Sequence, residues 1–288
     1  MTTIDTAFWT SLVVDGTTAT ATTFLLALGL FVTYGLFRVV NMAHGDMVML
    51  GAYMTSSFQT AGMGFLMAVC LATVTVALAA LVMERICVGR LREQASLSVL
   101  LATWGFGLII AQSTRLVAGS GGRFVDAPLS GQVEMLGSAY SIYQLSLVAS
   151  AAVLFALIWY LLAHTRLGLR IRSCVDNREL AELHGINTRL LFTVTFCVGG
   201  ALAGLAGGLL APLMAVNPSI GSDFSVTSFM VLITGGLGKI GSAALGALVV
   251  GGLRSTLGAL TTVTTAKLCT FLIVAVILAV RRQEMTLE

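Results

Sequence analysis

The amino-acid sequence predicts an all-α fold, a polytopic helical membrane protein with about eight or nine transmembrane segments, some of them short or broken. Of its 288 residues, 57% are hydrophobic and only 10% are charged, whereas soluble domains average about 25% charged residues. The mean hydropathy is +0.96. The apolar residues also run continuously, as in 66–83 and 269–280, without the period-two alternation of outer-membrane barrels. We expect residues 1–288 to form a single transmembrane domain.

Eight apolar stretches are the predicted spans: 20–37, 62–83, 98–117, 140–163, 190–213, 226–236, 243–257 and 266–280. The stretch 226–236 is short for a bilayer, and 41–60 is an ambiguous ninth segment, apolar but interrupted by polar residues and glycine. In 190–213, Gly200, Gly204 and Gly208 recur every fourth residue, which predicts close packing of a neighbouring helix on that face.

The basic residues predict the orientation, because cytoplasmic loops carry an excess of Lys and Arg. Twelve of them fall on one side of the predicted spans and four on the other. The twelve are Arg38, Arg85, Arg90, Arg92, Arg166, Arg170, Arg172, Arg178, Arg189, Lys239, Arg281 and Arg282; the four are Arg115, Arg123, Arg254 and Lys267. The loop 164–189 and the C-terminus are therefore predicted to be cytoplasmic, and the N-terminus external if 41–60 crosses.

Several chemistries are not expected in this chain. The five cysteines form no CxxC pair and no His/Cys cluster with zinc-ligand spacing. Residues 236–241 match GxGxxG formally, but they lie between two spans without a βαβ context, and Ile240 stands where a phosphate loop needs Ser or Thr. No nucleophile–base pair or paired acids interrupt the apolar stretches. We expect no catalytic residue, metal site, cofactor or nucleotide site, and the net charge of +3 gives no reason to expect a nucleic-acid partner.

Polar residues inside the ambiguous segment are the first candidate site. Asn41, His44 and Asp46 occupy nearly adjacent helical positions, and Gly45 loosens the backbone between them. Such groups are costly within a membrane unless they face a cavity or one another. Two interpretations stay open: a broken or re-entrant element lining a translocation pathway, and a structural polar cluster at a helix end. A metal bound by His44 alone is not expected.

Glycine and proline interrupt the chain again in 217–223 and at Gly235, Gly236 and Gly238. Gly-interrupted short segments in both halves of a transporter are the sequence pattern of a midplane substrate site. On this interpretation the three glycines join the residues of 41–46 in the pathway. The alternative is an ordinary external loop followed by a tight cytoplasmic turn.

The loop 164–189 is the longest polar segment and the third candidate site. It predicts a short helix with Asp176 or Asn177 as N-cap, Glu179 in the first turn and Gly185 as the stop. Leu180, Ala181 and Leu183 form a small apolar face that nothing in the loop is expected to bury. A partner protein would cover that face, or the helix would lie on lipid headgroups.

The sequence resembles the permease subunits of branched-chain amino-acid ABC importers, a family with urea and short-chain amide relatives. The resemblance covers nearly the whole chain and is strongest over 27–53, which contains Asn41-Met-Ala-His-Gly-Asp and Leu50-Gly-Ala-Tyr. It resumes at Thr165-Arg-Leu-Gly, at Ala181-x-x-x-Gly-Ile-Asn, at Ala201-Leu-Ala-Gly and at Gly235-Gly-Leu-Gly. Two family patterns are missing: Pro-Gly-Ala after the second Gly-rich region, where this chain has Gly241-Ser-Ala, and the C-terminal Arg-Pro-x-Gly-Leu.

The resemblance implies a multi-pass permease of the bacterial inner membrane that is not itself an enzyme. Its expected partners are two ATP-binding subunits, a second permease subunit that is a paralogue, a periplasmic solute-binding protein and membrane lipid. The segment Ala181-x-x-x-Gly is similar to the loop by which ABC permeases dock on their ATPases. This assigns ATPase coupling to the loop 164–189, through Asn177, Glu179, Leu180, Ala181, Leu183 and Gly185.

The solute is predicted from short matches that point in two directions. Leu101-Ala-Thr-Trp-Gly, the segment 129–134 and Thr227-Ser-Phe-Met-Val look more like the urea and amide permeases. Leu183-His-Gly-Ile-Asn-Thr and Asn217-Pro-Ser-Ile-Gly look like the amino-acid branch. We therefore favour urea or a short-chain amide, with branched-chain amino acids as the alternative. A stand-alone channel or secondary transporter, which needs no ATPase, is an alternative of another class.

Overall fold

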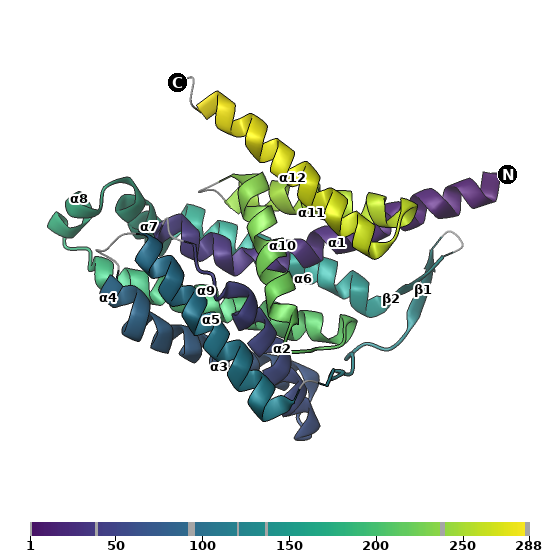
Figure 1. The fold of residues 1–288 in the computed structure, drawn as a ribbon, viewed down its shortest axis with the longest axis horizontal. Helices are drawn as coiled ribbons and strands as arrows, with labels where there is room; N and C mark the ends of the chain where they lie inside the picture. The colour runs from purple at the N-terminus through teal and green to yellow at the C-terminus, as the bar shows by residue number, and fades with distance from the viewer. Residues whose placement is uncertain are drawn as a thin grey trace.

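A computed structural model describes residues 2–37, 40–91, 96–119, 121–135, 138–236 and 240–285 of the chain (Figure 1). The longer helices are α1 (Thr2–Phe37), α2 (His44–Thr60), α3 (Phe65–Met83), α5 (Ser96–Ala118), α6 (Ile142–His164), α9 (Thr188–Leu210), α10 (Ile220–Gly235), α11 (Ile240–Leu260) and α12 (Val263–Met285). Shorter elements are a π-helical turn (Glu84–Val88), α4 (Gly89–Leu91), α7 (Arg166–Asp176), α8 (Arg178–Leu183) and a 3-10 turn (Ala211–Leu213). Strands β1 (Gln132–Met135) and β2 (Ser138–Ser141) form an antiparallel hairpin.

The prediction of a polytopic helical membrane protein is confirmed. Among the described residues, six helices are long and apolar enough to cross a membrane: Phe8–Gly35, Phe65–Leu91, Leu97–Ala118, Ile142–His164, Thr188–Leu213 and Gly241–Leu260. Two shorter apolar helices, Ile220–Gly235 and Val263–Ile277, join them. Every predicted span corresponds to one of these helices, and the ambiguous segment 41–60 becomes α2.

Two predicted boundaries are wrong, because both helices extend into polar sequence. Helix α1 begins at Thr2, well before the predicted start at 20. Its threonine-rich part is tolerated within the helix because Thr20 and Thr22 donate their hydroxyls to the carbonyls of Gly16 and Thr18, one turn earlier, so that these polar groups are satisfied. Helix α10 begins at Ile220 and so includes residues that we expected in a loop.

Close packing on the glycine face of α9 is confirmed. A Cβ at Gly200 would overlap Ala80, and one at Gly204 would lie 2.8 Å from the Cβ of Val76, both in α3. On the neighbouring side of α9, Gly204 faces Gly51 of α2. Helix α9 is therefore held between α2 and α3 at distances that only small residues permit.

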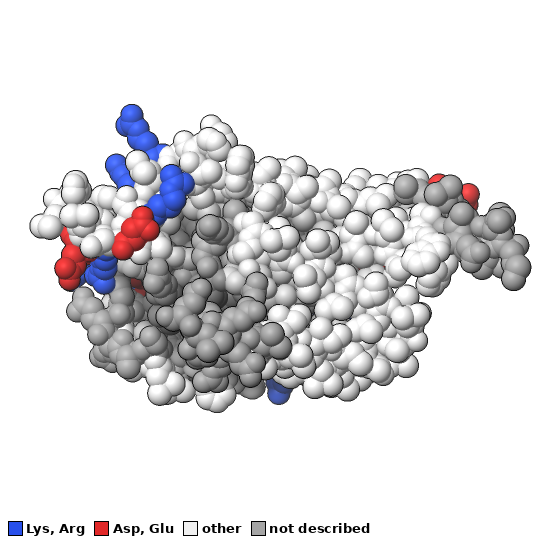
Figure 2. All heavy atoms as spheres, turned by 90° about the horizontal axis from the view of Figure 1, so that it is seen from above, with Lys and Arg blue, Asp and Glu red and all other residues white. Residues whose placement is uncertain are grey.

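The other helices lie around α2, α3 and α9 and run in different directions. Figure 1 shows α10 running steeply across α1, while α7 and α8 lie at the end of the molecule opposite the β-hairpin. Figure 2 shows Lys and Arg side chains gathered at the α7–α8 end. This grouping agrees with the charge asymmetry found in the sequence. Arg38, Arg92 and Lys239 lie outside the described residues, and which end is cytoplasmic stays a prediction.

Candidate functional site

The polar segment 41–46 folds into the start of α2, inside the helix bundle. The side chains of Asn41 and His44 are 5% and 1% exposed. The Asn41 Oδ1 accepts a hydrogen bond from the backbone N–H of Ala43 at 3.0 Å. The His44 Nε2 lies 2.8 Å from the carbonyl oxygen of Leu26 in α1. Since a carbonyl only accepts, we assign the proton of the imidazole to Nε2.

Helices α1, α2 and α10 meet at this carbonyl. The hydroxyl of Ser228 in α10 donates to the same Leu26 oxygen at 2.9 Å. Leu26 is eleven residues before the end of α1 at Phe37, a distance of roughly 16 Å along a helix. Helix α2 therefore begins well inside the bundle, at the depth of the middle of α1.

Gly45 and Asp46 form the contact between α2 and the start of α10. A Cβ at Gly45 would overlap the backbone of Gly221 and Ser225. The half-buried Asp46 carboxylate lies between Gly221 of α10 and Gly107 of α5. Among the described residues, this carboxylate has no hydrogen bond or ion pair. A negative charge beside the first turn of α10 is favoured by that helix's dipole.

The glycines predicted for the pathway lie elsewhere. Gly235 packs against the first turn of α11, and Gly236, with φ +82°, ends α10 and accepts a hydrogen bond from Ser242 at 3.0 Å. Gly238 lies outside the described residues. Gly235 and Asp46 are at opposite ends of α10, whose 16 residues extend about 24 Å. The structure does not bring the two predicted sets together.

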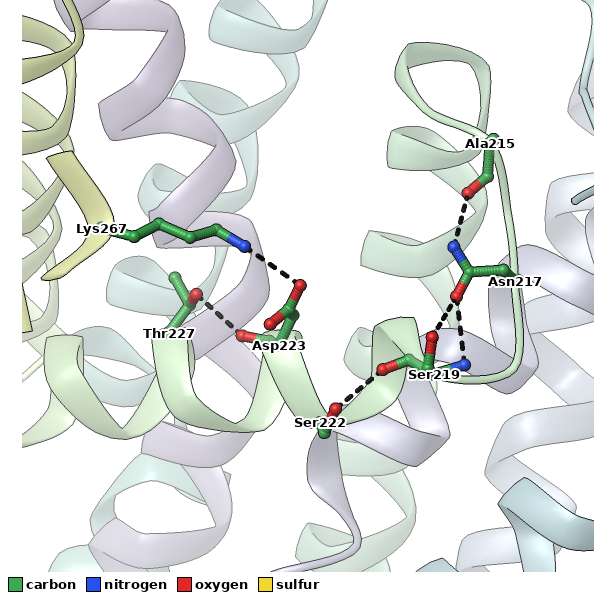
Figure 3. A network of polar contacts seen from close by, with 7 residues as sticks. All are labelled: Ala215, Asn217, Ser219, Ser222, Asp223, Thr227 and Lys267. Atoms are coloured by element: carbon green, nitrogen blue, oxygen red, sulfur yellow. Dashed lines mark hydrogen bonds and ion pairs between the residues drawn. The ribbon is translucent and has the colours of Figure 1, made fainter. Parts of the chain in front are cut away.

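A polar network surrounds the start of α10 (Figure 3). The Asn217 Oδ1 accepts from the N–H and the hydroxyl of Ser219, at 3.1 and 2.7 Å, and this turn begins the helix. One turn further, Asp223 pairs with Lys267 of α12 at 3.1 Å, although their side chains are 65% and 47% exposed. An exposed ion pair between apolar helices needs water or a partner around it. Sequence reasoning placed Asp223 in a loop and did not connect it with Lys267.

The α7–α8 unit, by which we mean α7 and α8, is fixed by helix caps, of which those at Asn177 and Gly185 were predicted. Thr165 caps α7 by accepting from Gly168 N–H at 3.2 Å. Asn177 is the N-cap of α8, because its Oδ1 accepts from Leu180 N–H at 2.9 Å. Gly185 follows the helix with φ +78°, and Ile186 N–H returns to the carbonyl of Ala181 at 3.1 Å. This is the C-terminal glycine motif that the sequence predicted.

The expected apolar face of α8 needs one correction. Ala181 is 4% exposed and packs with Cys174, Leu191 and Phe192 in a small separate core. The expectation that nothing in the loop buries it is wrong, because α7 and the start of α9 supply a surface for it. Leu180 and Leu183 stay 52% and 84% exposed, and Glu179 is exposed beside them.

Glu182 stabilises this unit and was not predicted. It accepts hydrogen bonds from Arg178 Nε at 3.2 Å and from the hydroxyl of Thr188 at the start of α9. These bonds, with the one from Thr188 the larger cause, hold the pKa of the Glu182 carboxyl below its usual range. The guanidinium of Arg178 also lies 5.6 Å from the ring centroid of Phe192. The i,i+4 spacing of Arg178 and Glu182 is the signal that could have found this pair.

The family model and the relatives that match most of this chain carry the same description. Residues 12–281 match the family model described as branched-chain amino acid transport system / permease component. The chain is 30% identical over 254 residues to the high-affinity branched-chain amino acid transport system permease protein BraD of Pseudomonas aeruginosa, covering 83% of this chain and 82% of that protein.

More distant or shorter matches point to related permeases. The chain is 27% identical over 262 residues to the high-affinity branched-chain amino acid transport system permease protein LivH of Salmonella typhimurium, covering 82% of each. It is 31% identical over 115 residues, 38% of this chain and 36% of the other, to the ribose import permease protein RbsC of Escherichia coli. No solved structure matches this chain.

Proposed function

Because the chain belongs to the permease family of branched-chain amino acid transport systems, we propose that it is the membrane subunit of an ATP-driven importer for branched-chain amino acids. The match over residues 12–281 carries this proposal. The comparisons do not support the sequence-based preference for urea or a short-chain amide. They favour its alternative, amino-acid import, because BraD and LivH, each matched over most of this chain, are named as permeases of branched-chain amino acid transport systems.

The proposed complex contains two ATP-binding subunits, a second permease subunit that is a paralogue, and a periplasmic solute-binding protein. The chain would be one transmembrane domain in the bacterial inner membrane, with its C-terminus and the loop 164–189 in the cytoplasm. The gathering of basic side chains at the α7–α8 end supports this orientation. In that orientation the Asp223–Lys267 pair faces the external half of the membrane.

We assign the ATPase contact to the α7–α8 unit. Leu180 and Leu183 present exposed apolar surface next to Glu179, while the caps Asn177 and Gly185 fix the helix that carries them. Ala181 does not face the ATPases itself; its contacts with Leu191 and Phe192 join α8 to α9. A displacement of α8 by the ATPases would therefore reach the glycine face of α9 and shift the populations of inward-open and outward-open states.

The proposed solute is tested by competition for uptake. Cells that express the complex and lack other leucine transporters should take up labelled leucine. Unlabelled isoleucine and valine should suppress this uptake, because they share the charged groups and branched apolar side chain of leucine. Urea and acetamide should leave it unchanged. Suppression by urea or acetamide but not by valine would contradict amino-acid import.

Within the segment 41–46 we expect Asn41 to stabilise the fold and Asp46 to serve the translocation pathway. Asn41→Leu should lower the yield of assembled complex, because the buried N–H of Ala43 loses its acceptor at a cost of about 1–3 kcal/mol. Asp46→Leu should assemble normally yet reduce uptake per complex about ten-fold, since its carboxylate has no structural partner among the described residues. Asp126→Leu, at an exposed acid outside the helices, is the control. Unchanged uptake by Asp46→Leu would remove Asp46 from the pathway.

A further inference from the structure

A cavity of about 460 Å³ lies between α1, α11 and α12, and none of the residues predicted for the pathway or the ATPase contact lines it. Sites for small molecules are typically about 300–1,000 Å³. The cavity is lined by one acidic residue, Asp15 of α1, and by one basic residue, Arg254 of α11. Next to the cavity α1 and α11 pack closely, because Gly251 lies against the backbone of Thr20.

The two charges are not paired with each other or with another side chain. Among the described residues, neither Asp15 nor Arg254 has an ion pair within 4.0 Å or a side-chain hydrogen bond. Asp223 is near enough to act electrostatically on the half-buried Arg254, but its carboxylate binds Lys267. The side chain of Asp15 is exposed, whereas that of Arg254 is half-buried. A half-buried arginine on a membrane helix without an ion-pair partner is costly unless it faces water or a ligand.

A third polar group also lacks a partner. The hydroxyl oxygen of Ser255, next to Arg254 on α11, is buried and has no hydrogen bond within the described parts of the chain. Ser255 lines the same cavity. Since buried polar atoms are almost always hydrogen-bonded, rotation of the Ser255 side chain into the cavity would let a ligand supply the missing partner.

The cavity also has an apolar part to its lining. Leu12, Ala259, Val263 and Ala266 line the cavity together with the polar residues. One cavity thus offers an anion, a cation, a hydroxyl and an aliphatic surface. An apolar α-amino acid is the solute whose groups match these four.

We propose that this cavity binds the zwitterion of an apolar α-amino acid. The ammonium group binds Asp15, the carboxylate binds Arg254 and the hydroxyl of Ser255, and the side chain packs on Leu12 and Val263. This inference rests on the proposed function, since it names the residues that recognise the imported solute. Urea and acetamide carry neither charge and do not satisfy the site.

The test is equilibrium binding of labelled leucine to the purified complex in lipid nanodiscs, without the solute-binding protein. Two analogues each lack one charge: leucinamide has no carboxylate and 4-methylpentanoate has no ammonium group. Each analogue should bind at least about ten-fold more weakly than leucine, since a charge-assisted hydrogen bond is lost. Equal binding of leucine and both analogues by the unaltered complex overturns the proposal without any variant.

Variants assign each charge to one group of the ligand. Arg254→Gln should weaken leucine binding about ten-fold and abolish the preference for leucine over leucinamide. Asp15→Asn should abolish the preference for leucine over 4-methylpentanoate instead. Arg115→Gln and Glu134→Gln, at an exposed arginine and an exposed glutamate elsewhere, are the matched controls and should bind like the unaltered complex.

The outcomes separate this inference from the proposed function. Leucine uptake that is unchanged in both variants, with unchanged leucine binding, overturns the site but leaves amino-acid import standing. Uptake of urea without uptake of leucine by the unaltered complex refutes the proposed function itself. A phospholipid that co-purifies with the unaltered complex but not with the variants, with equal leucine binding, assigns the cavity to a lipid headgroup and also overturns the proposal.

Discussion

Replacing Gly207 with valine should abolish the folded protein. Gly207 lies on α9 where the chain crosses α2, and a Cβ there would overlap the carbonyl oxygen of Val48 and lie 2.8 Å from the backbone nitrogen of Ala52. Backbone atoms cannot rotate away as a side chain can, so α2 must move. The expected cost is on the order of 3 kcal/mol or more, and the displaced helix carries His44 and Asp46.

The yield and thermal stability of the purified protein in detergent measure this effect. Gly105→Val is the matched control, because a Cβ at Gly105 in α5 meets no described atom within 4 Å. The control should behave like the unaltered protein, apart from the small helix propensity difference between glycine and valine. Equal yield and melting temperature for the two variants would show that α9 and α2 do not pack as closely as described.

The second large effect is expected at Leu183. Leu183→Asp should abolish co-purification of the ATP-binding subunits, because a charge replaces an apolar side chain at the centre of the proposed contact, where it would be desolvated. The protein itself should remain folded, since Leu183 is 84% exposed. Co-purification at normal stoichiometry would remove α8 from the ATPase contact.

A matched control separates docking from a general effect of the new charge. Leu116 in α5 is 86% exposed and lies near the end of that helix away from α8, so Leu116→Asp should leave the ATPases bound. Ala181→Glu is a poorer test, because Ala181 is buried against Leu191 and Phe192. That variant would disturb the α7–α8 unit and the contact together.

The parts of the structure that could be predicted are those fixed by local sequence. Continuous apolar runs located the membrane helices, and the cap at Asn177 and the stop at Gly185 depend only on neighbouring backbone groups. The burial of Ala181 could not be predicted, because α7 and α9 supply its contacts. The same holds for Asp15 and Arg254, which are far apart in the chain and share one cavity only after α1 and α11 have packed.

The predictions of the pathway residues and of the solute show what short sequence patterns cannot establish. The helical spacing of Asn41 and His44 suggested groups that face a channel, yet both side chains are buried and bonded within the protein. Spacing gives the direction of a side chain on its own helix but not what lies opposite. In the same way, short matches such as Leu101-Ala-Thr-Trp-Gly favoured urea, whereas similarity over most of the chain favours amino acids.

The central claim is that this chain carries a branched-chain amino acid across the membrane only when ATPase subunits drive it. Uptake of labelled leucine by proteoliposomes that contain the complex, with the solute-binding protein outside and ATP on the cytoplasmic side, tests it most directly. Leucine should accumulate above its external concentration with ATP and stay outside without it. Equilibration of leucine or urea without ATP or the ATPase subunits would contradict the claim and indicate a channel.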